Sequence, residues 1–181
     1  MDDKKIYKLL RHWFPELKKK KLPKKKHRRN FKAFLKWVAV EKVAHQTREY
    51  WMKIDRNLYS ENGLVSCSVL HDHHADIQAA QTLIRQRAKP LFEHFDQYHA
   101  VIGRYYSVYD QVFDIVFEEV LNLVKACGFE MLLIYADHFY WCMVPNNEVL
   151  IEKFCKFFEK QFKEDGLSIE HYAVLDCPRS T

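Results

Sequence analysis

Scarce glycine is the feature that most restricts how this chain can fold. Its 181 residues include 4 Gly and 5 Pro, whereas an all-β sandwich or barrel needs tight turns at short intervals. The spacing of apolar residues instead favours long helices joined by few connections. Hydrophobic residues make up 48% of the chain and aromatic residues 15%, which is enough for one domain with a packed core.

Positive charge is concentrated near the N-terminus. Residues 1–32 contain 14 of the 29 Lys and Arg but 3 of the 24 Asp and Glu, so they carry +11 and the remainder carries −6. We therefore divide the chain into a basic N-terminal arm, residues 1–32, and a single α+β domain, residues 33–181. Apolar residues from Ile6 to Trp13 predict a short amphipathic helix in the arm. Pro23 and repulsion among neighbouring lysines predict an extended, mobile linker over residues 17–29.

Helical spacing of apolar residues continues beyond the arm. It predicts a second helix over residues 30–58, with Asn30 as its N-cap. It also predicts helices over residues 75–127, where Pro90 is expected to start a new helix or to kink the old one. Gly103 is expected to separate two helices within this range.

Four short stretches have the pattern of β-strands. Alternation over residues 64–70 predicts one strand. Residues 130–136 and 139–144 predict an antiparallel hairpin, followed by a helix capped by Asn146 or Asn147. Residues 167–175 predict a final strand. The fold class is therefore α+β and predominantly helical, with long amphipathic helices packed on a small antiparallel sheet and a C-terminal β-β-α-β unit.

The basic arm is the first candidate binding surface. Its lysines and arginines would contact phosphates, which gives salt-dependent affinity with little sequence preference. An anionic membrane surface is the alternative partner, but the short helix has a modest apolar face and no lipidation signal is visible. Nucleic acid is therefore preferred. The candidate residues are Lys18, Lys19, Lys20, Lys21, Lys24, Lys25, Lys26, Arg28 and Arg29.

A dense group of histidines and carboxylates spans residues 71–76. Such side chains can bind a divalent metal, and His71-Asp72 resembles the His-Asp pair of the HD-type metal phosphohydrolases. The resemblance implies an upstream histidine, for which His45 is a candidate, and a downstream aspartate, for which the candidates are Asp110, Asp114 and Asp137. The preferred interpretation is that Asp72 or Asp76 caps the following helix and that the histidines are solvated.

Other polar and aromatic residues give further candidates. Arg87 and His94 resemble the Arg-and-His spacing of the HEPN class of RNA-cleaving helical domains, although Pro90 is expected to disturb the helix between them. Asp137-His138 is expected at the rim of the hairpin, where His171 could join it. The tyrosines that could stack on bases are Tyr98, Tyr105, Tyr106 and Tyr109.

Three consecutive aromatic residues, Phe139 to Trp141, must point alternately to the two faces of the sheet. One face of the hairpin is therefore expected to be apolar and uncovered, which would suit a protein partner. The five cysteines include no CxxC pair, which indicates reduced thiols and a cytoplasmic location. No cofactor is expected, because the glycine-rich loops that bind nucleotides are missing.

Three functions follow from these patterns. The first is a non-enzymatic nucleic-acid-associated protein, in which the basic arm contacts phosphates and the acidic body binds a protein partner or dimerises. The second is a protein-binding inhibitor or immunity-type protein with no nucleic-acid role. The third is a metal-dependent phosphohydrolase that uses His71 and Asp72 together with His45.

Overall fold

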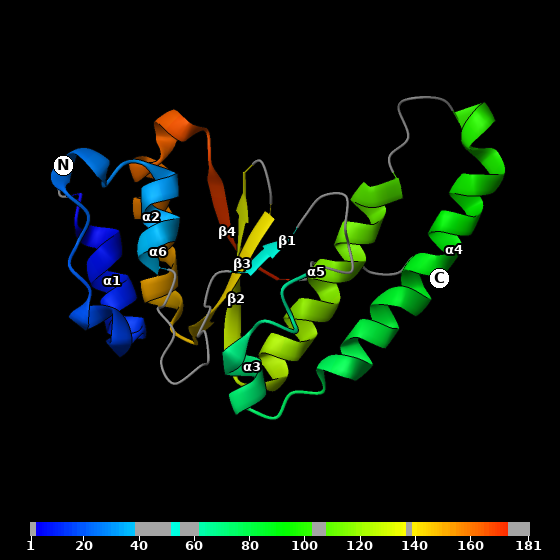
Figure 1. Cartoon of the computed structure of the whole chain (residues 1–181), viewed down its shortest axis with the longest axis horizontal. Coiled ribbons are helices and arrows are strands. Elements are labelled where there is room, and N and C mark those ends of the chain that lie inside the picture. The colour runs from blue at the N-terminus through cyan, green and yellow to red at the C-terminus, as the bar shows by residue number, and fades with distance from the viewer. Residues whose placement is uncertain (1–2, 39–51, 55–61, 103–107, 137–138, 174–181) are drawn as a thin grey trace.

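The molecule has three layers, with an antiparallel sheet between two groups of helices (Figure 1). In the computed structural model, residues 3–38, 52–54, 62–102, 108–136 and 139–173 are described. Within these ranges the chain is mostly helical and its sheet is small. The predicted α+β, predominantly helical fold class is therefore confirmed.

The sheet has four strands in the order β1-β3-β2-β4, and every neighbouring pair is antiparallel. Strands β2 and β3 form the predicted hairpin, and β4 is the predicted final strand. Helix α6, Glu148–Gln161, lies between β3 and β4 in the sequence, so the expected β-β-α-β order is confirmed. The strands are β1 Met52–Ile54, β2 Phe129–Tyr135, β3 Phe139–Pro145 and β4 Ser168–Tyr172.

Both faces of the β2–β3 hairpin are apolar. Along β2, Met131 and Leu133 belong to one core cluster, whereas Leu132 and Ile134 belong to another. This alternation follows from the pleat of a strand, which points successive side chains to opposite faces. All four side chains are fully buried, so both faces of the sheet are covered.

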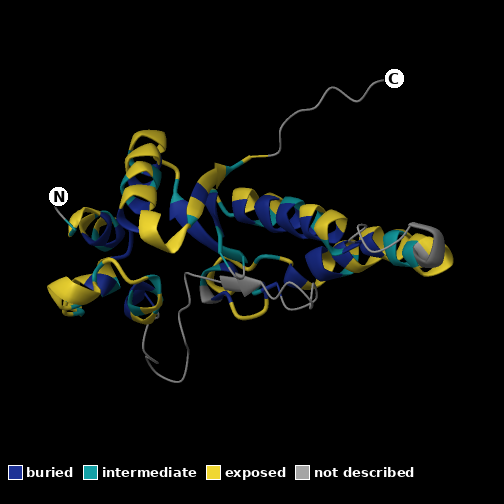
Figure 2. Ribbon diagram, turned by 90° about the horizontal axis from the view of Figure 1, so that it is seen from above, coloured by how far each residue is buried: buried dark blue, intermediate teal, exposed yellow. Residues whose placement is uncertain are grey.

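Helices α4, Ile77–Ile102, and α5, Val108–Ala126, cover the first face together with the short α3, Ser68–Asp72. Buried residues (dark blue in Figure 2) run along α5, and they belong to the same core cluster as Met131 and Leu133 of β2. Arg87 on α4 binds both Glu118 and Glu119 of α5, with the Glu119 carboxylate at 2.6 Å. This ion pair ties the two long helices together.

Helices α1, Lys5–Trp13, α2, Phe31–Val38, and α6 cover the second face. Apolar side chains of α1 and α6 pack together, as the 5.1 Å separation between the ring centroids of Trp13 and Phe154 shows. The expectation of an uncovered apolar sheet face was therefore wrong. The amphipathic helix predicted in the arm is present, and its apolar side supplies part of the missing cover.

The segment between α1 and α2, residues 15–29, is called the basic loop below. It contains two short 3₁₀ helices, η1 at Pro15–Lys19 and η2 at Lys25–His27. The expectation of a wholly extended linker was wrong, because the backbone of the loop is held by side chains described below. The division between arm and domain at residue 32 stays a prediction, but residues on both sides of it share one core cluster.

The helix predicted over residues 30–58 is only partly correct. Asn30 is its N-cap, since its Oδ1 accepts a hydrogen bond from Ala33 N–H at 2.8 Å. The helix is seen as α2, and residues 39–51 and 55–58 lie outside the described residues. Met52–Ile54 is strand β1, which pairs with Phe139–Trp141 at the open edge of β3. Residues 52–54 therefore form a strand because they pair with β3, although the spacing of apolar residues around them is that of a helix.

The strand predicted over residues 64–70 was wrong, because this stretch forms a turn that leads into α3. Asn62 holds the turn: its Oδ1 accepts from Leu64 N–H at 3.2 Å, and its carbonyl accepts from the Trp141 indole at 2.7 Å. Leu64, Cys67 and Leu70 are buried at intervals of three. That spacing places them on one side of a helical turn and not on one face of a strand.

The predicted helix boundaries had mixed outcomes. Helix α4 runs through Pro90, so no helix begins there. The break expected near Gly103 is confirmed, since α4 ends at Ile102 and α5 begins at Val108, although Gly103 itself lies outside the described residues. Asn147 caps α6 by accepting from Leu150 N–H at 3.1 Å. None of the described helices is both long and apolar enough to cross a membrane.

The docking of α1 can be tested at Leu10, whose side chain is fully buried. We expect Leu10→Ala to lower the free energy of unfolding by about 2–5 kcal/mol, because it removes buried methyl groups and leaves a cavity. Urea unfolding of the full chain measures this change. Leu9→Ala, at a half-buried position on the same helix, should cost less. Equal, small effects would show that α1 does not stabilise the domain.

The turn after α5 depends on Gly128, whose φ of +81° lies in the left-handed region. A Cβ added there would meet nothing within 4 Å, so the cost of a substitution comes from the backbone alone. We expect Gly128→Ala to lower the free energy of unfolding by about 1–2 kcal/mol. Gly128→Asn should cost less, because asparagine tolerates this conformation. Thermal unfolding of the two variants compares them, and an alanine variant as stable as the parent would contradict the assignment.

Candidate nucleic-acid interface

The first half of the basic loop is held in place through its backbone carbonyls. The Arg11 guanidinium, on α1, donates to the carbonyls of Leu17, at 3.2 Å, and of Lys20. The indole N–H of Trp37, on α2, donates to the carbonyl of Lys21 at 3.0 Å. Arg11 and Trp37, on the two flanking helices, therefore hold this stretch through its backbone carbonyls.

The second half is fixed around Arg28. The Arg28 guanidinium donates to the Pro23 carbonyl and pairs with the Asp3 carboxylate, each at 3.0 Å. The Arg28 carbonyl accepts from the Tyr7 hydroxyl at 3.0 Å and from the Gln161 side-chain amide at 2.7 Å. Burial raises the pKa of Tyr7 well above its ordinary value, so this hydroxyl keeps its proton and remains a donor.

The candidate phosphate-binding side chains differ in how far they are exposed to solvent. Arg28 belongs to the fold, since only 14% of its side chain is exposed and it is paired with Asp3. Lys20 is half-buried. The others extend from the anchored backbone into solvent; these exposed residues are Lys18, Lys19, Lys21, Lys24, Lys25, Lys26 and Arg29.

A pocket of about 550 Å³ opens beside the end of the basic loop. Three segments far apart in the sequence form it. The first is residues 30–32 at the start of α2, and the second includes Tyr135 and Tyr140 of the hairpin. The third is residues 165–168, which run from the end of η3, Lys163–Asp165, to the first residue of β4. Its volume lies in the range of roughly 300–1,000 Å³ typical of ligand sites.

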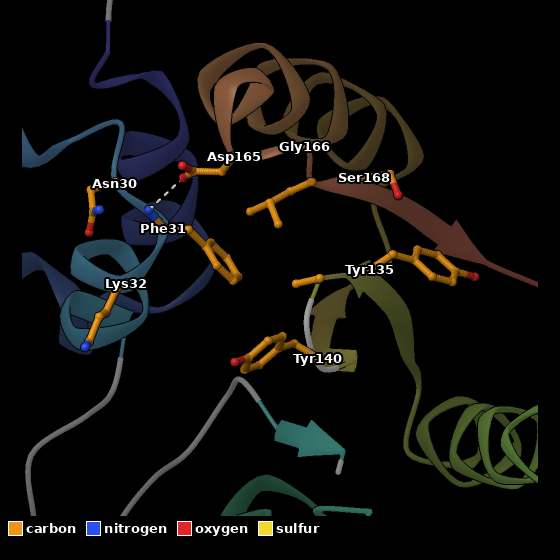
Figure 3. A pocket seen from close by; sticks show the side chains of 10 residues that line it. Asn30, Phe31, Lys32, Tyr135, Tyr140, Asp165, Gly166 and Ser168 are labelled. Carbon is orange, nitrogen blue, oxygen red and sulfur yellow. Dashed lines mark hydrogen bonds between the residues drawn. The ribbon is translucent and has the colours of Figure 1, made fainter. Parts of the chain in front are cut away.

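The side chains of the pocket differ in direction (Figure 3). Phe31 and Tyr140 point toward its middle, whereas Tyr135 points away from it, with its hydroxyl donating to Glu170 at 2.6 Å. The Asp165 carboxylate accepts from Phe31 N–H at 3.1 Å, and this bond joins two walls of the pocket. Sequence reasoning missed this site, because its residues share no local pattern and converge only in the folded chain.

The histidine cluster at residues 71–76 lies on the surface. His71 and His73 each place a ring nitrogen within 2.9 Å of a backbone carbonyl, those of Val65 and Val69 respectively. Asp76 caps α4 by accepting from Ala79 N–H at 2.9 Å. The preferred interpretation, a helix cap beside exposed histidines, is therefore confirmed for Asp76.

The metal hypothesis for His71 and Asp72 gains no support from the described part of the chain. His71-Asp72 lies in the last turn of α3, and the strand predicted over residues 64–70 does not precede it. Among the described residues, no three His, Cys, Asp or Glu side chains are grouped closely enough to hold a metal ion. His45 lies outside those residues, so its part in the hypothesis stays a prediction.

Two other sequence candidates have structural roles. Arg87 is bound by Glu118 and Glu119, while the His94 ring contacts the Tyr98 ring, with the centroids 4.7 Å apart. The contacts described for Arg87 and His94 are therefore with different residues, and the intervening Pro90 does not break the helix. Asp137, His138, Tyr105 and Tyr106 lie outside the described residues.

Burial raises the pKa of three of the described cysteines, Cys127, Cys142 and Cys155. Cys67 and Cys142 are buried and form no disulfide, in agreement with the reduced, buried thiols that the sequence predicted. Burial raises the pKa of Cys142 well above its ordinary value and is the main reason that the pKa of Cys155 rises to about 11. Both thiols therefore stay protonated near neutral pH.

Comparison with known protein families, curated proteins and solved structures found no match for this chain.

His171, a further sequence candidate, binds a buried carboxylate. Its Nε2 lies 2.7 Å from Glu130 Oε2, and the Lys125 ammonium binds the same oxygen. Burial alone raises the pKa of Glu130, but the hydrogen bonds from Lys125 and His171 lower it by more, so that the net pKa is below its ordinary value. The cluster therefore holds a charged Glu130 between the end of α5 and strand β4.

This depressed pKa predicts a pH dependence of stability. A carboxylate whose pKa is lower in the folded chain than in the unfolded chain stabilises the fold at pH values above its pKa in the unfolded chain. This contribution to the free energy of unfolding is lost as the pH falls through its pKa in the folded chain. We expect Glu130→Gln to lower the free energy of unfolding near neutral pH, and the difference from the parent to shrink below about pH 4. Urea unfolding at several pH values measures this. Glu152→Gln, at an exposed position on α6, is the control, and a Glu130→Gln deficit independent of pH would contradict the expectation.

Proposed function

We propose that this protein is a non-enzymatic nucleic-acid-binding protein whose basic loop contacts phosphates. The observation that carries the proposal is the anchoring of the loop by Arg11, Arg28 and Trp37, which hold its backbone through carbonyl groups. The side chains of the exposed lysines are not among the groups that form these backbone-holding hydrogen bonds. Ammonium groups on such a surface act as point charges for phosphate oxygens.

The anchored backbone also supports binding in energetic terms. A disordered lysine tract loses conformational freedom when it binds, and that loss opposes affinity. A loop whose backbone is already fixed loses only side-chain freedom. The basic loop is therefore better suited to binding a polyanion than its composition alone suggests.

The position of α1 favours nucleic acid over a membrane surface. A helix that binds a membrane must insert its apolar side into the lipid interface. In α1 that side is already occupied, since Ile6, Tyr7 and Leu10 are fully buried against the rest of the protein. The remaining exposed feature of the segment is its charge. The net −6 outside residues 1–32 would repel a polyanion and direct it toward the loop.

The test compares two variants that each remove two positive charges. Lys24→Gln/Lys25→Gln alters the loop, whereas Arg85→Gln/Lys89→Gln alters exposed positions on α4, which lies at the other end of the molecule (Figure 1). Fluorescence anisotropy measures binding of duplex DNA and single-stranded RNA across a salt series. We expect the loop variant to reduce the slope of log K against log salt on duplex DNA by about 0.9 for each phosphate that the protein no longer neutralises. The α4 variant should keep the parent's slope.

Point substitutions are preferred to deletion of residues 1–32, because deletion would also remove α1 from the core. Equal losses of affinity in the two variants would contradict a site on the loop and indicate attraction by net charge. Failure of the full chain to bind either nucleic acid at low salt would overturn the proposal. A protein partner, the second function that the sequence suggests, would then be sought.

A further inference from the structure

The basic loop leads directly into the pocket. Arg29, the last residue of the loop, precedes Asn30, Phe31 and Lys32, which line one wall. The position of this junction is fixed on both sides, by the hydrogen bond from Gln161 to the Arg28 carbonyl and by that from Phe31 N–H to Asp165. A ligand whose phosphates lie on the loop therefore has the pocket within immediate reach.

The middle of the pocket is aromatic. Figure 3 shows the Phe31 and Tyr140 rings pointing toward it from two neighbouring walls. Their rings meet edge to face, with centroids 5.6 Å apart, and Leu167 adds an aliphatic surface. Phe31 also contacts Phe34, Phe158 and Phe162, so its ring is fixed by the core. Rigid aromatic surfaces of this kind stack on nucleobases.

The rim of the pocket is polar. Asn30, Asp165 and Ser168 carry amide, carboxylate and hydroxyl groups, and Lys32 carries an ammonium group. These groups include both donors and acceptors, as needed for the edges of a base. An aromatic middle with a polar rim, next to a basic surface, fits a nucleotide unit better than it fits a purely apolar ligand.

We propose that this pocket receives an unpaired base of a single-stranded nucleic acid whose phosphates lie on the basic loop. The inference rests on the proposed function and narrows its substrate class. A base within a duplex is stacked and paired, so it cannot enter a pocket without the cost of extrusion. The protein therefore binds single strands with a contribution that a duplex does not receive.

The experiment uses the full chain and fluorescence anisotropy at one salt concentration. The probes are single-stranded RNA, single-stranded DNA of the same sequence, and the matching DNA duplex. Tyr140→Leu removes the stacking ring and keeps an apolar side chain, whereas Tyr140→Phe keeps the ring and is the matched control. We expect Tyr140→Leu to weaken single-strand binding roughly 5- to 150-fold, which corresponds to the loss of one base–aromatic stack. Duplex binding and Tyr140→Phe should stay at parental values.

A second pocket variant distinguishes loss of the binding site from loss of folding. Ala136 lines the pocket, and Ala136→Phe is designed to fill the space without removing a wall. It should reproduce the single-strand defect of Tyr140→Leu. Thermal unfolding of each variant checks that the chain is folded. An abasic strand, which offers phosphates without bases, should bind the parent and Tyr140→Leu equally, because the pocket then has no ligand.

The outcomes separate this inference from the proposed function. If Lys24→Gln/Lys25→Gln weakens binding while both pocket variants bind single strands like the parent, the loop is the binding site and the pocket inference is overturned. If the pocket variants weaken duplex and single-strand binding equally, the pocket inference is also overturned. If the full chain binds none of the probes, both proposals fail. Selective loss of single-strand binding in both pocket variants supports the inference.

Discussion

Burial of both faces of the β2–β3 hairpin is the constraint on which the rest of the structure depends. Each face carries a row of large apolar side chains, so neither can be left in water. Helices α4 and α5 cover one row, and α6 covers the other together with α1 and α2. Because α1 comes first in the sequence and packs beside α6, the chain must then cross to reach α2. The basic loop makes that crossing, so its position at the surface is a consequence of core packing.

The same packing places the basic loop and the pocket side by side. Phe31 is part of the aromatic core through its contacts with Phe34 and Phe162, and it also forms a wall of the pocket. Asp165 joins the start of α2 to the turn before β4. Residues that stabilise the fold therefore also shape the pocket, which keeps its geometry independent of any ligand. Such prior organisation lowers the entropic cost of binding.

The elements that sequence reasoning predicted correctly are those with strong local signals. The hairpin has two short apolar runs on either side of Asp137-His138, α6 has an asparagine cap, and β4 follows a glycine turn. The errors arose where distant residues decide. Met52–Ile54 is a strand because β3 offers it an open edge, and the turn at Asn62 depends on Trp141. The lysine tract indicated a charged surface correctly, but the groups that fix its backbone, such as Arg11 and Trp37, lie outside it. The pocket draws on three separate segments and left no local pattern.

The basic loop depends on two kinds of residue, those that hold its backbone and those that supply its exposed charge, and the two are under different evolutionary constraints. Arg11, Arg28 and Trp37 hold the backbone, and their loss would disturb the fold. The exposed lysines make no comparable contribution to stability, since the loop backbone is held through its carbonyl groups, which every residue type provides. Substitutions at these lysine positions can therefore accumulate without unfolding the protein. Descendants of one ancestral sequence could diverge in charge, and hence in the partners they select, while they retain the same architecture.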